Sequence, residues 1–215
     1  MWNEVLFVLL MFLGTMNCNN LVVSGRPLLH GITNKESTVS KVLEHELKVA
    51  ASADEVWSVY GSPELPMHLL EMLPGSFEKV KITGDGGVGT IIDLTFPPGE
   101  FPHAYKEKFV FIDHKLRILK VQIIDGDYAN LGVTYYMDTI IVVETGPDSC
   151  VIKSSMEYYV KPEFANIVEP LIDTVSVASM AEAVAKKVLE EKHKSSEENP
   201  SITTPFGPTQ ERGQN

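Results

Sequence analysis

The chain has 215 residues, of which 44% are hydrophobic and 22% charged, as in an ordinary globular protein of one domain with appendages. Its formal net charge of −11 argues against a binder of nucleic-acid phosphates, because such binding depends on clustered Lys and Arg. An acidic surface is compatible with a cationic amine as ligand. Only Cys18 and Cys150 are cysteines, so neither a disulfide framework nor a thiolate metal site is expected.

The first residues predict a secretory leader. Residues 5–13 are an unbroken apolar run that suits a signal peptide and is too short to span a bilayer, although the preceding residues lack the usual Lys or Arg. We expect a signal peptide over 1–18, an N-terminal extension over 19–37, and entry into the endoplasmic reticulum lumen, with the vacuole as a further destination left open. No stable membrane span is expected. Residues 195–215 are polar and are expected to form a disordered tail.

Residues 38–194 are expected to form the folded domain, with a β segment, short helices, a β-meander and a long helix in that order. Ser52, with Glu55 three residues later, predicts a capping box at the start of a helix. That helix is expected to carry Val56, Trp57 and Tyr60. A second short helix is expected after Pro63.

Alternating apolar and polar residues predict the strands of the meander. The runs cover residues 77–83, 90–96, 105–113, 116–124, 133–143 and 151–160. Gly84 to Gly89 matches the letters of the dinucleotide motif GxGxxG, but a strand-like run follows where that motif needs a helix. We therefore predict a glycine-rich hairpin.

One amphipathic helix is expected from Pro162 to about Lys192, with a kink at Pro170 because proline lacks an N–H donor. Its apolar stripe would comprise Phe164, Ile167, Val168, Leu171, Val175, Met180, Val184 and Val188. A curved antiparallel sheet with such a helix against its concave side leaves room for a ligand between the two layers.

Two acidic residues lie in strand-like runs. Alternation places Tyr105, Glu107, Phe109 and Phe111 on one face of a strand. On the concave side, burial would raise the pKa of Glu107 and suit it to proton transfer; on the other side it would be solvated beside its lysines. Asp138 interrupts an apolar strand and either faces water or serves the cavity.

Other reactive side chains give no pattern. The histidines show no metal-type spacing, and Cys150 is expected to be a buried small hydrophobe.

Several longer segments of the chain are distinctive. They are Gly84-Asp85-Gly86-Gly87, Gly99-Glu100-Phe101-Pro102-His103, Tyr105-Lys106-Glu107-Lys108-Phe109, Leu131-Gly132-Val133-Thr134-Tyr135-Tyr136-Met137-Asp138-Thr139 and Cys150-Val151-Ile152-Lys153-Ser154-Ser155. These segments resemble the norcoclaurine synthases, within the pathogenesis-related class 10, Bet v 1-like superfamily. The resemblance implies an α+β helix-grip fold: a seven-stranded antiparallel sheet wrapped around a long C-terminal helix, with two short helices and a large internal cavity.

The resemblance also implies an activity. Norcoclaurine synthases condense dopamine with 4-hydroxyphenylacetaldehyde to (S)-norcoclaurine, a Pictet–Spengler reaction of benzylisoquinoline alkaloid biosynthesis that needs no metal or organic cofactor. It implies catalytic roles for three residues: Glu107 as the base, Asp138 engaging the incoming groups and Tyr105 positioning the substrate. The implied apolar lining comprises Leu73, Phe77, Leu94 and Met180.

The chain departs from the family at one position, where Leu119 stands in place of the pocket lysine. Alternation places the neighbouring Lys120 on the opposite face, and nothing in the sequence indicates a bulge that would re-aim it. Two hypotheses follow: a norcoclaurine synthase weakened by Leu119, or a non-catalytic carrier of alkaloids or other aromatic metabolites. Whether the protein is a monomer or a homodimer is left open.

Overall fold

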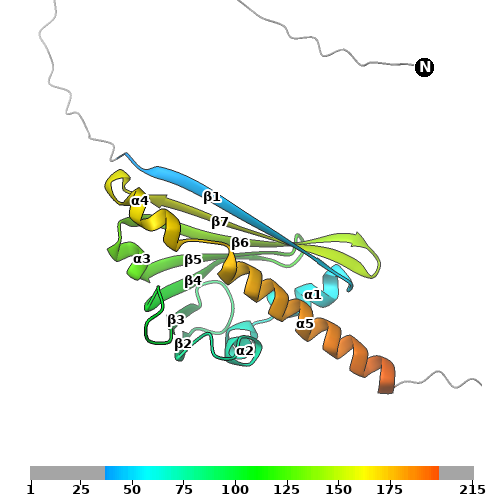
Figure 1. The fold of residues 1–215 in the computed structure, drawn as a ribbon. Coiled ribbons are helices and arrows are strands. Elements are labelled where there is room, and N and C mark those ends of the chain that lie inside the picture. Colours follow the sequence, from blue (N-terminus) through cyan, green and yellow to red (C-terminus); the bar gives the residue numbers. More distant parts are fainter. Residues whose placement is uncertain (1–36, 199–215) are drawn as a thin grey trace, which may run out of the picture. The chain divides into compact units, whose positions relative to one another are not determined.

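The computed structural model describes residues 37–198, which form an antiparallel sheet of seven strands around a long helix (Figure 1). The strand order is β1-β7-β6-β5-β4-β3-β2. The fold predicted from the resemblance is therefore confirmed. The expected signal peptide, nearly all of the expected N-terminal extension and most of the expected tail lie outside the described residues. Residues 195–198, expected to belong to the disordered tail, are helical because the last helix continues through them.

The strands follow the predicted meander. Strand β1 (Val39–Val49) pairs with β7 (Ser149–Val160), so the strands that come first and last in the sequence lie side by side in the sheet. The strands between them are β2 (Lys79–Thr83), β3 (Ile91–Thr95), β4 (Ala104–Asp113), β5 (Ile118–Gly126) and β6 (Val133–Gly146).

Both predicted short helices are present. Helix α1 (Ala53–Tyr60) begins with the expected capping box: the Glu55 N–H donates to the Ser52 hydroxyl oxygen at 3.2 Å, and the Ser52 N–H donates to the Glu55 carboxylate at 2.7 Å. Helix α2 (Leu65–Met72) follows. A third helix, α3 (Asp127–Asn130), lies between β5 and β6 and was not expected.

The expected helix from Pro162 is not continuous. Short turns of helix, η1 (Pro162–Phe164), α4 (Ala165–Val168) and η2 (Glu169–Leu171), come first, and Ile172 is extended. Pro170 cannot donate to the helical ladder, and its ring opposes a continuous helix. The Val175 N–H then donates to the Asp173 carboxylate at 2.9 Å, and α5 (Val175–Glu198) begins there.

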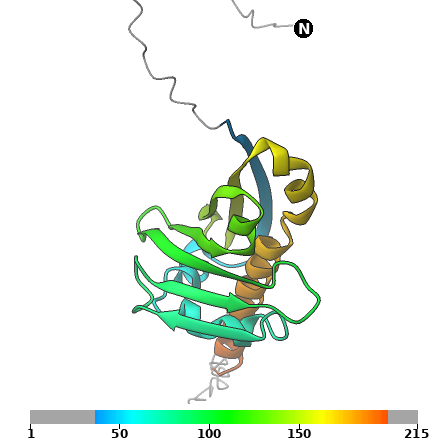
Figure 2. The same ribbon diagram turned by 90° about the vertical axis from the view of Figure 1, so that its left-hand side faces the viewer.

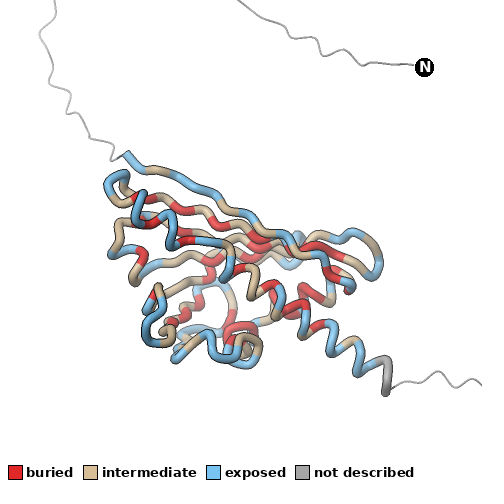
Figure 3. The backbone as a smooth tube through the Cα atoms, viewed as in Figure 1, coloured by how far each residue is buried: buried red, intermediate tan, exposed pale blue. Residues whose placement is uncertain are grey.

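This interruption also corrects the expected apolar stripe. Ile167 and Val175 are 54% and 63% exposed, whereas Val184 and Val188 farther along α5 are buried in the core. The helix that packs against the sheet is therefore α5, which runs along the concave side (Figure 2). Buried residues gather on the sheet face toward α5 and on the inner sides of α1 and α2 (Figure 3).

A bulge in β4 corrects the prediction for Phe111. Phe109 pairs with Val121 and Phe111 with Lys120, so Val110 is the extra residue and alternation reverses after it. Phe109 is 2% exposed, but Phe111 is 41% exposed on the outer face. Phe111 is therefore not part of the concave face.

The glycine-rich segment is the predicted hairpin, and strand β3 follows it. Gly86 has a φ of +86°, its N–H donates to the Thr90 hydroxyl oxygen at 2.9 Å, and a Cβ there would lie 1.8 Å from the Pro63 carbonyl oxygen. Only glycine fits this contact between the hairpin and the segment before α2.

Within residues 37–198 no helix has the length and apolarity needed to cross a bilayer.

Candidate functional site

A cavity of about 670 Å³ lies between the sheet, α2, the segment after α2 and the start of α5. Its wall includes every site residue expected from the sequence. These are Leu73, Phe77, Leu94, Tyr105, Glu107, Leu119, Asp138 and Met180. The structure thus brings all of them together at one site, and their individual roles stay predictions.

Glu107 lies on the concave face of β4, opposite Ile92 of β3 and Ile123 of β5. Burial, together with the negative charge of Asp138, raises the pKa of Glu107 to about 8. Part of its surface is open to the cavity, but the carboxyl group is shielded from bulk water. Of the two placements that the sequence left open, the structure has the concave one.

Asp138 faces the same cavity from β6, where it lies opposite Val121 of β5 and Met156 of β7. Burial raises its pKa to about 7. Its Oδ1 atom is buried and has no hydrogen-bond partner among the described residues. A carboxyl group in this state is available to a ligand, either as a hydrogen-bond acceptor or, when protonated, as a donor.

Tyr105 lies two residues before Glu107 in β4, so the two side chains are on the same face of the strand. Burial and the charges of Glu107 and Asp138 raise its pKa well above the usual value, so the phenol is neutral. Its strand partner Gly126 has a φ of +116°, and a Cβ there would lie 2.5 Å from the Tyr105 Cα. Glycine at 126 therefore lets β5 approach β4 closely where Tyr105 enters the cavity.

An aromatic wall continues from Tyr105 in both directions, and the sequence analysis did not identify it. Ring centroids are 5.5 Å apart between Phe77 and Phe96 and 5.3 Å between Phe96 and Tyr105. They are 5.9 Å apart between Tyr105 and Tyr128 and 5.2 Å between Tyr128 and Tyr136. These contacts offer a planar ligand several ring faces and edges.

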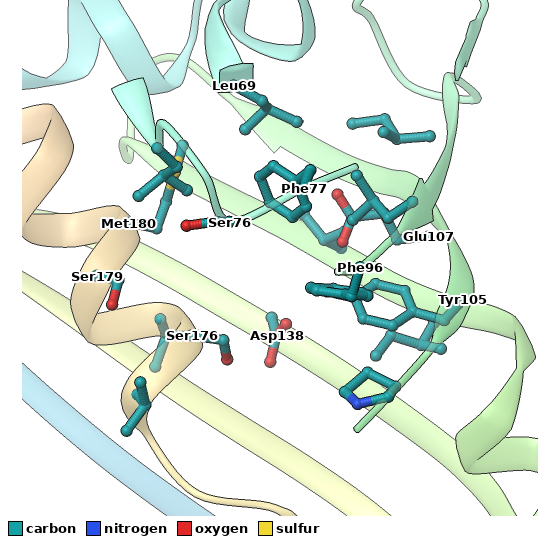
Figure 4. Close-up of a pocket in the computed structure, with 18 of the residues that line it drawn as sticks. Leu69, Ser76, Phe77, Phe96, Tyr105, Glu107, Asp138, Ser176, Ser179 and Met180 are labelled. Carbon is teal, nitrogen blue, oxygen red and sulfur yellow. The ribbon is translucent and has the colours of Figure 1, made fainter. Parts of the chain in front are cut away.

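Figure 4 shows how the polar groups are distributed around this wall. Glu107 and Asp138 point into the space beside Phe96 and Tyr105, and serines of α5 face them from the opposite side. The serines are Ser176 and Ser179. The sequence analysis missed them because it treated α5 only as an apolar stripe.

No Lys, Arg or His belongs to the described cavity wall, whereas its acidic residues are Glu100, Glu107, Asp138 and Asp173. Glu100 and Asp173 are exposed, while the other two are inside. The site is therefore electrostatically suited to a ligand with a positive charge.

Leu119 is 2% exposed in the cavity wall and pairs with Ile112 and Ile140. The Lys120 ammonium lies 6.0 Å from the ring centroid of Phe111 on the outer face. Lys120 therefore does not replace a lysine at position 119. Cys150 is buried, and no group of His, Cys, Asp or Glu within residues 37–198 has the arrangement of a metal site.

The fold and the cavity define a helix-grip protein whose cavity, between the sheet and the long helix, has the size of a site for a small organic ligand. The family model described as "Pathogenesis-related protein Bet v 1 family" matches residues 38–191. The chain belongs to this family.

Its relatives are more specific. The chain is 69% identical to S-norcoclaurine synthase 2 of Coptis japonica over 194 residues, 90% of this chain and 97% of the relative. It is 64% identical to S-norcoclaurine synthase of Thalictrum flavum subsp. glaucum over 194 residues, 89% of this chain and 92% of the relative. A solved structure of norcoclaurine synthase from Thalictrum flavum, in complex with dopamine and hydroxybenzaldehyde, matches with a TM-score of 0.72 at 62% identity. That match covers 80% of this chain and 98% of the other.

Proposed function

We propose that this protein is an (S)-norcoclaurine synthase that condenses dopamine with 4-hydroxyphenylacetaldehyde in benzylisoquinoline alkaloid biosynthesis. The observation that carries the proposal is the placement of Glu107 and Asp138, two carboxyl groups with raised pKa values, in one aromatic cavity. The identity to norcoclaurine synthases over nearly the whole chain supports the same reaction.

The chemistry has two stages. The amine of dopamine adds to the aldehyde carbon, and loss of water gives an iminium ion. The ring carbon para to the 3-hydroxyl then attacks the iminium carbon, and a base removes the proton from the attacked ring carbon to restore aromaticity. The sum is one carbon–nitrogen and one carbon–carbon bond formed and one water released, which places the reaction among the lyases.

Each carboxyl group has a task in this scheme. Glu107, with a pKa of about 8, is suited to accept the ring proton near neutral pH. Asp138 has a buried oxygen without a hydrogen-bond partner in residues 37–198, and it holds the incoming amine or the hydroxyl that leaves as water. Tyr105 is neutral and orients the ring by stacking and hydrogen bonding. No metal or organic cofactor takes part in any of these steps.

Leu119 supports a second candidate function. A cation near the catechol would favour its deprotonation and hence its attack, and Leu119 supplies none. A protein that keeps the cavity but catalyses poorly would serve as a carrier of alkaloids or other aromatic metabolites.

A chiral product assay separates the two functions. Purified protein is incubated with dopamine and 4-hydroxyphenylacetaldehyde, and the enantiomers of norcoclaurine are quantified against a reaction without protein. An excess of the S enantiomer at a rate proportional to protein concentration supports the enzyme. Racemic product at the background rate, with tight binding of aromatic ligands, supports the carrier.

The cellular location follows from the leader and is a separate proposal. We expect the apolar run at residues 5–13 to direct the chain into the endoplasmic reticulum lumen, with cleavage near Cys18. N-terminal sequencing of the plant-expressed protein tests this, and a mature chain that still begins with Met1 contradicts it.

A further inference from the structure

The last residue of α1, Tyr60, has a polar group that the proposed mechanism does not use. Tyr60 belongs to the cavity wall and is 2% exposed. Its hydroxyl oxygen is buried and has no hydrogen-bond partner among the described residues. A buried hydroxyl without a partner costs free energy, so this position calls for an explanation beyond packing.

The surroundings of Tyr60 differ from those of the other tyrosines in the wall. Burial alone raises the pKa of Tyr60, whereas the charge of Asp138 also raises the pKa values of Tyr105, Tyr128 and Tyr136. The carboxyl groups make no contribution to the pKa of Tyr60. The wall residues Leu65 and Leu69, from the helix that follows α1, are apolar and belong to the same core cluster as Tyr60.

We propose that the Tyr60 hydroxyl is a substrate-positioning group that hydrogen-bonds a ring hydroxyl of the ligand at this apolar end of the cavity. A phenol hydroxyl can donate or accept a hydrogen bond, so Tyr60 can pair with a ring hydroxyl that acts as either acceptor or donor. The hydroxyl has almost no accessible surface in the structure, so the proposed hydrogen bond requires a small movement of the side chains around it when the ligand binds.

The proposal rests on the proposed function only for the choice of ligand, a hydroxylated phenethylamine. Binding of dopamine and of phenethylamine, which lacks the ring hydroxyls, is measured by calorimetry on the full chain and on Tyr60→Phe. We expect the parent to prefer dopamine. In Tyr60→Phe the affinity for dopamine should fall about tenfold, the scale of one hydrogen bond, and that for phenethylamine should not change.

Two controls make this result specific. Tyr158→Phe removes a hydroxyl from another buried tyrosine, on β7 and outside the cavity wall, and should leave both affinities unchanged. The thermal unfolding temperature of ligand-free Tyr60→Phe should equal or exceed that of the parent, because the variant loses only an unpaired hydroxyl. 3-Hydroxyphenethylamine and 4-hydroxyphenethylamine then show which ring hydroxyl is bound.

Several results would overturn the proposal. If Tyr60→Phe loses the same affinity for dopamine as for phenethylamine, Tyr60 only packs against the ligand. If the parent binds phenethylamine as tightly as dopamine, no ring hydroxyl is hydrogen-bonded. A lower unfolding temperature for Tyr60→Phe would assign the hydroxyl to the fold. If the preference is lost as expected but the parent forms no norcoclaurine, the inference stands and the proposed function fails.

Discussion

Burial raises the pKa of Glu107 on β4, and the charge of Asp138 on β6 raises it further, although strand β5 lies between the two residues. The two carboxyl groups share one cavity and titrate as a pair. Near neutral pH the repulsion disfavours a second charge after the first carboxyl group has lost its proton. With a pKa of about 7 against about 8 for Glu107, Asp138 loses its proton first, so near neutral pH the site presents the Asp138 carboxylate together with Glu107, whose ionised fraction is the base.

Replacement of Glu107 tests the base. Glu107→Gln keeps the size of the side chain but cannot accept the ring proton, so turnover to (S)-norcoclaurine should fall by about 10²-fold or more, the scale of a lost general base. Dopamine binding, measured by calorimetry, should change much less. Glu78→Gln makes the same chemical change at an exposed position outside the cavity wall and should leave turnover intact. Full turnover in Glu107→Gln would assign the base elsewhere, with Asp138 as the next candidate.

The stability of the protein should fall as pH rises from about 5 to 8. Glu107 and Asp138 have folded-state pKa values of about 8 and about 7, above the ordinary values of 4.5 and 3.8 that apply after unfolding. The folded state thus binds more protons in this range, and the free energy of unfolding decreases with pH. Glu55 and Asp127, whose pKa values are lowered, have already lost their protons at pH 5 in both states.

Urea unfolding at pH 5, 6.5 and 8 measures this decrease. In Glu107→Gln the free energy of unfolding should fall less between pH 5 and 8 than in the parent, by more than about 1 kcal/mol. Glu78→Gln should follow the parent. A parallel pH dependence in Glu107→Gln and parent would mean that Glu107 is charged in the folded protein at neutral pH.

A lysine at position 119 should accelerate the reaction. In Leu119→Lys an ammonium group enters the cavity wall, where a catechol oxygen or Glu107 pairs with it, and the rate of (S)-norcoclaurine formation should rise well above that of the parent. Burial of the new charge should cost several kcal/mol of stability, which thermal unfolding would reveal.

Two variants accompany this test. Leu119→Met keeps an apolar side chain at the same place and should not raise the rate. Lys120→Leu removes the outer lysine and should leave the rate unchanged, because its ammonium lies over Phe111 and not in the cavity. A folded Leu119→Lys variant without any gain would favour the carrier function, and a slow Lys120→Leu variant would show that Lys120 acts in place of the family lysine.

Gly86→Ala should destabilise the protein by more than Gly89→Ala. Gly86 and Gly89 both have positive φ angles, which cost an alanine about 1–2 kcal/mol. A Cβ at Gly86 would in addition collide with the Pro63 carbonyl, whereas a Cβ at Gly89 would have nothing within 4 Å. The free energies of unfolding in urea compare the two variants. Equal losses would mean that the hairpin moves away from Pro63 without cost.

The features that the sequence predicted correctly have local causes. Ser52 and Glu55 satisfy each other's backbone groups within one turn, so the pair is readable without the rest of the fold. Strict alternation correctly placed Glu107 on one face of the strand with Tyr105 and Phe109, but it left open whether that face was the concave one. The alternating runs and the resemblance both indicated the strands and the cavity, whereas the roles of the residues that line the cavity came from the resemblance alone.

The features that were missed depend on other segments. Phe109, Val110 and Phe111 are all apolar, so nothing in their pattern shows where β4 gains its extra residue, which only pairing with β5 reveals. Helix α3 has four residues, too few to show a helical periodicity in the sequence. The sequence pattern therefore could not indicate that Tyr128 lines the cavity.

The position of Lys120 on the outer face of β5 determines which reagents can reach it. Lys120 lies beside Phe111 outside the sheet, so an amine-reactive acylating agent should label it equally well in the presence and absence of a saturating cavity ligand. In Leu119→Lys the introduced amine is enclosed with the ligand and should be protected from the same reagent. Competitive labelling with mass-spectrometric readout thus distinguishes lysines at two consecutive positions of one strand.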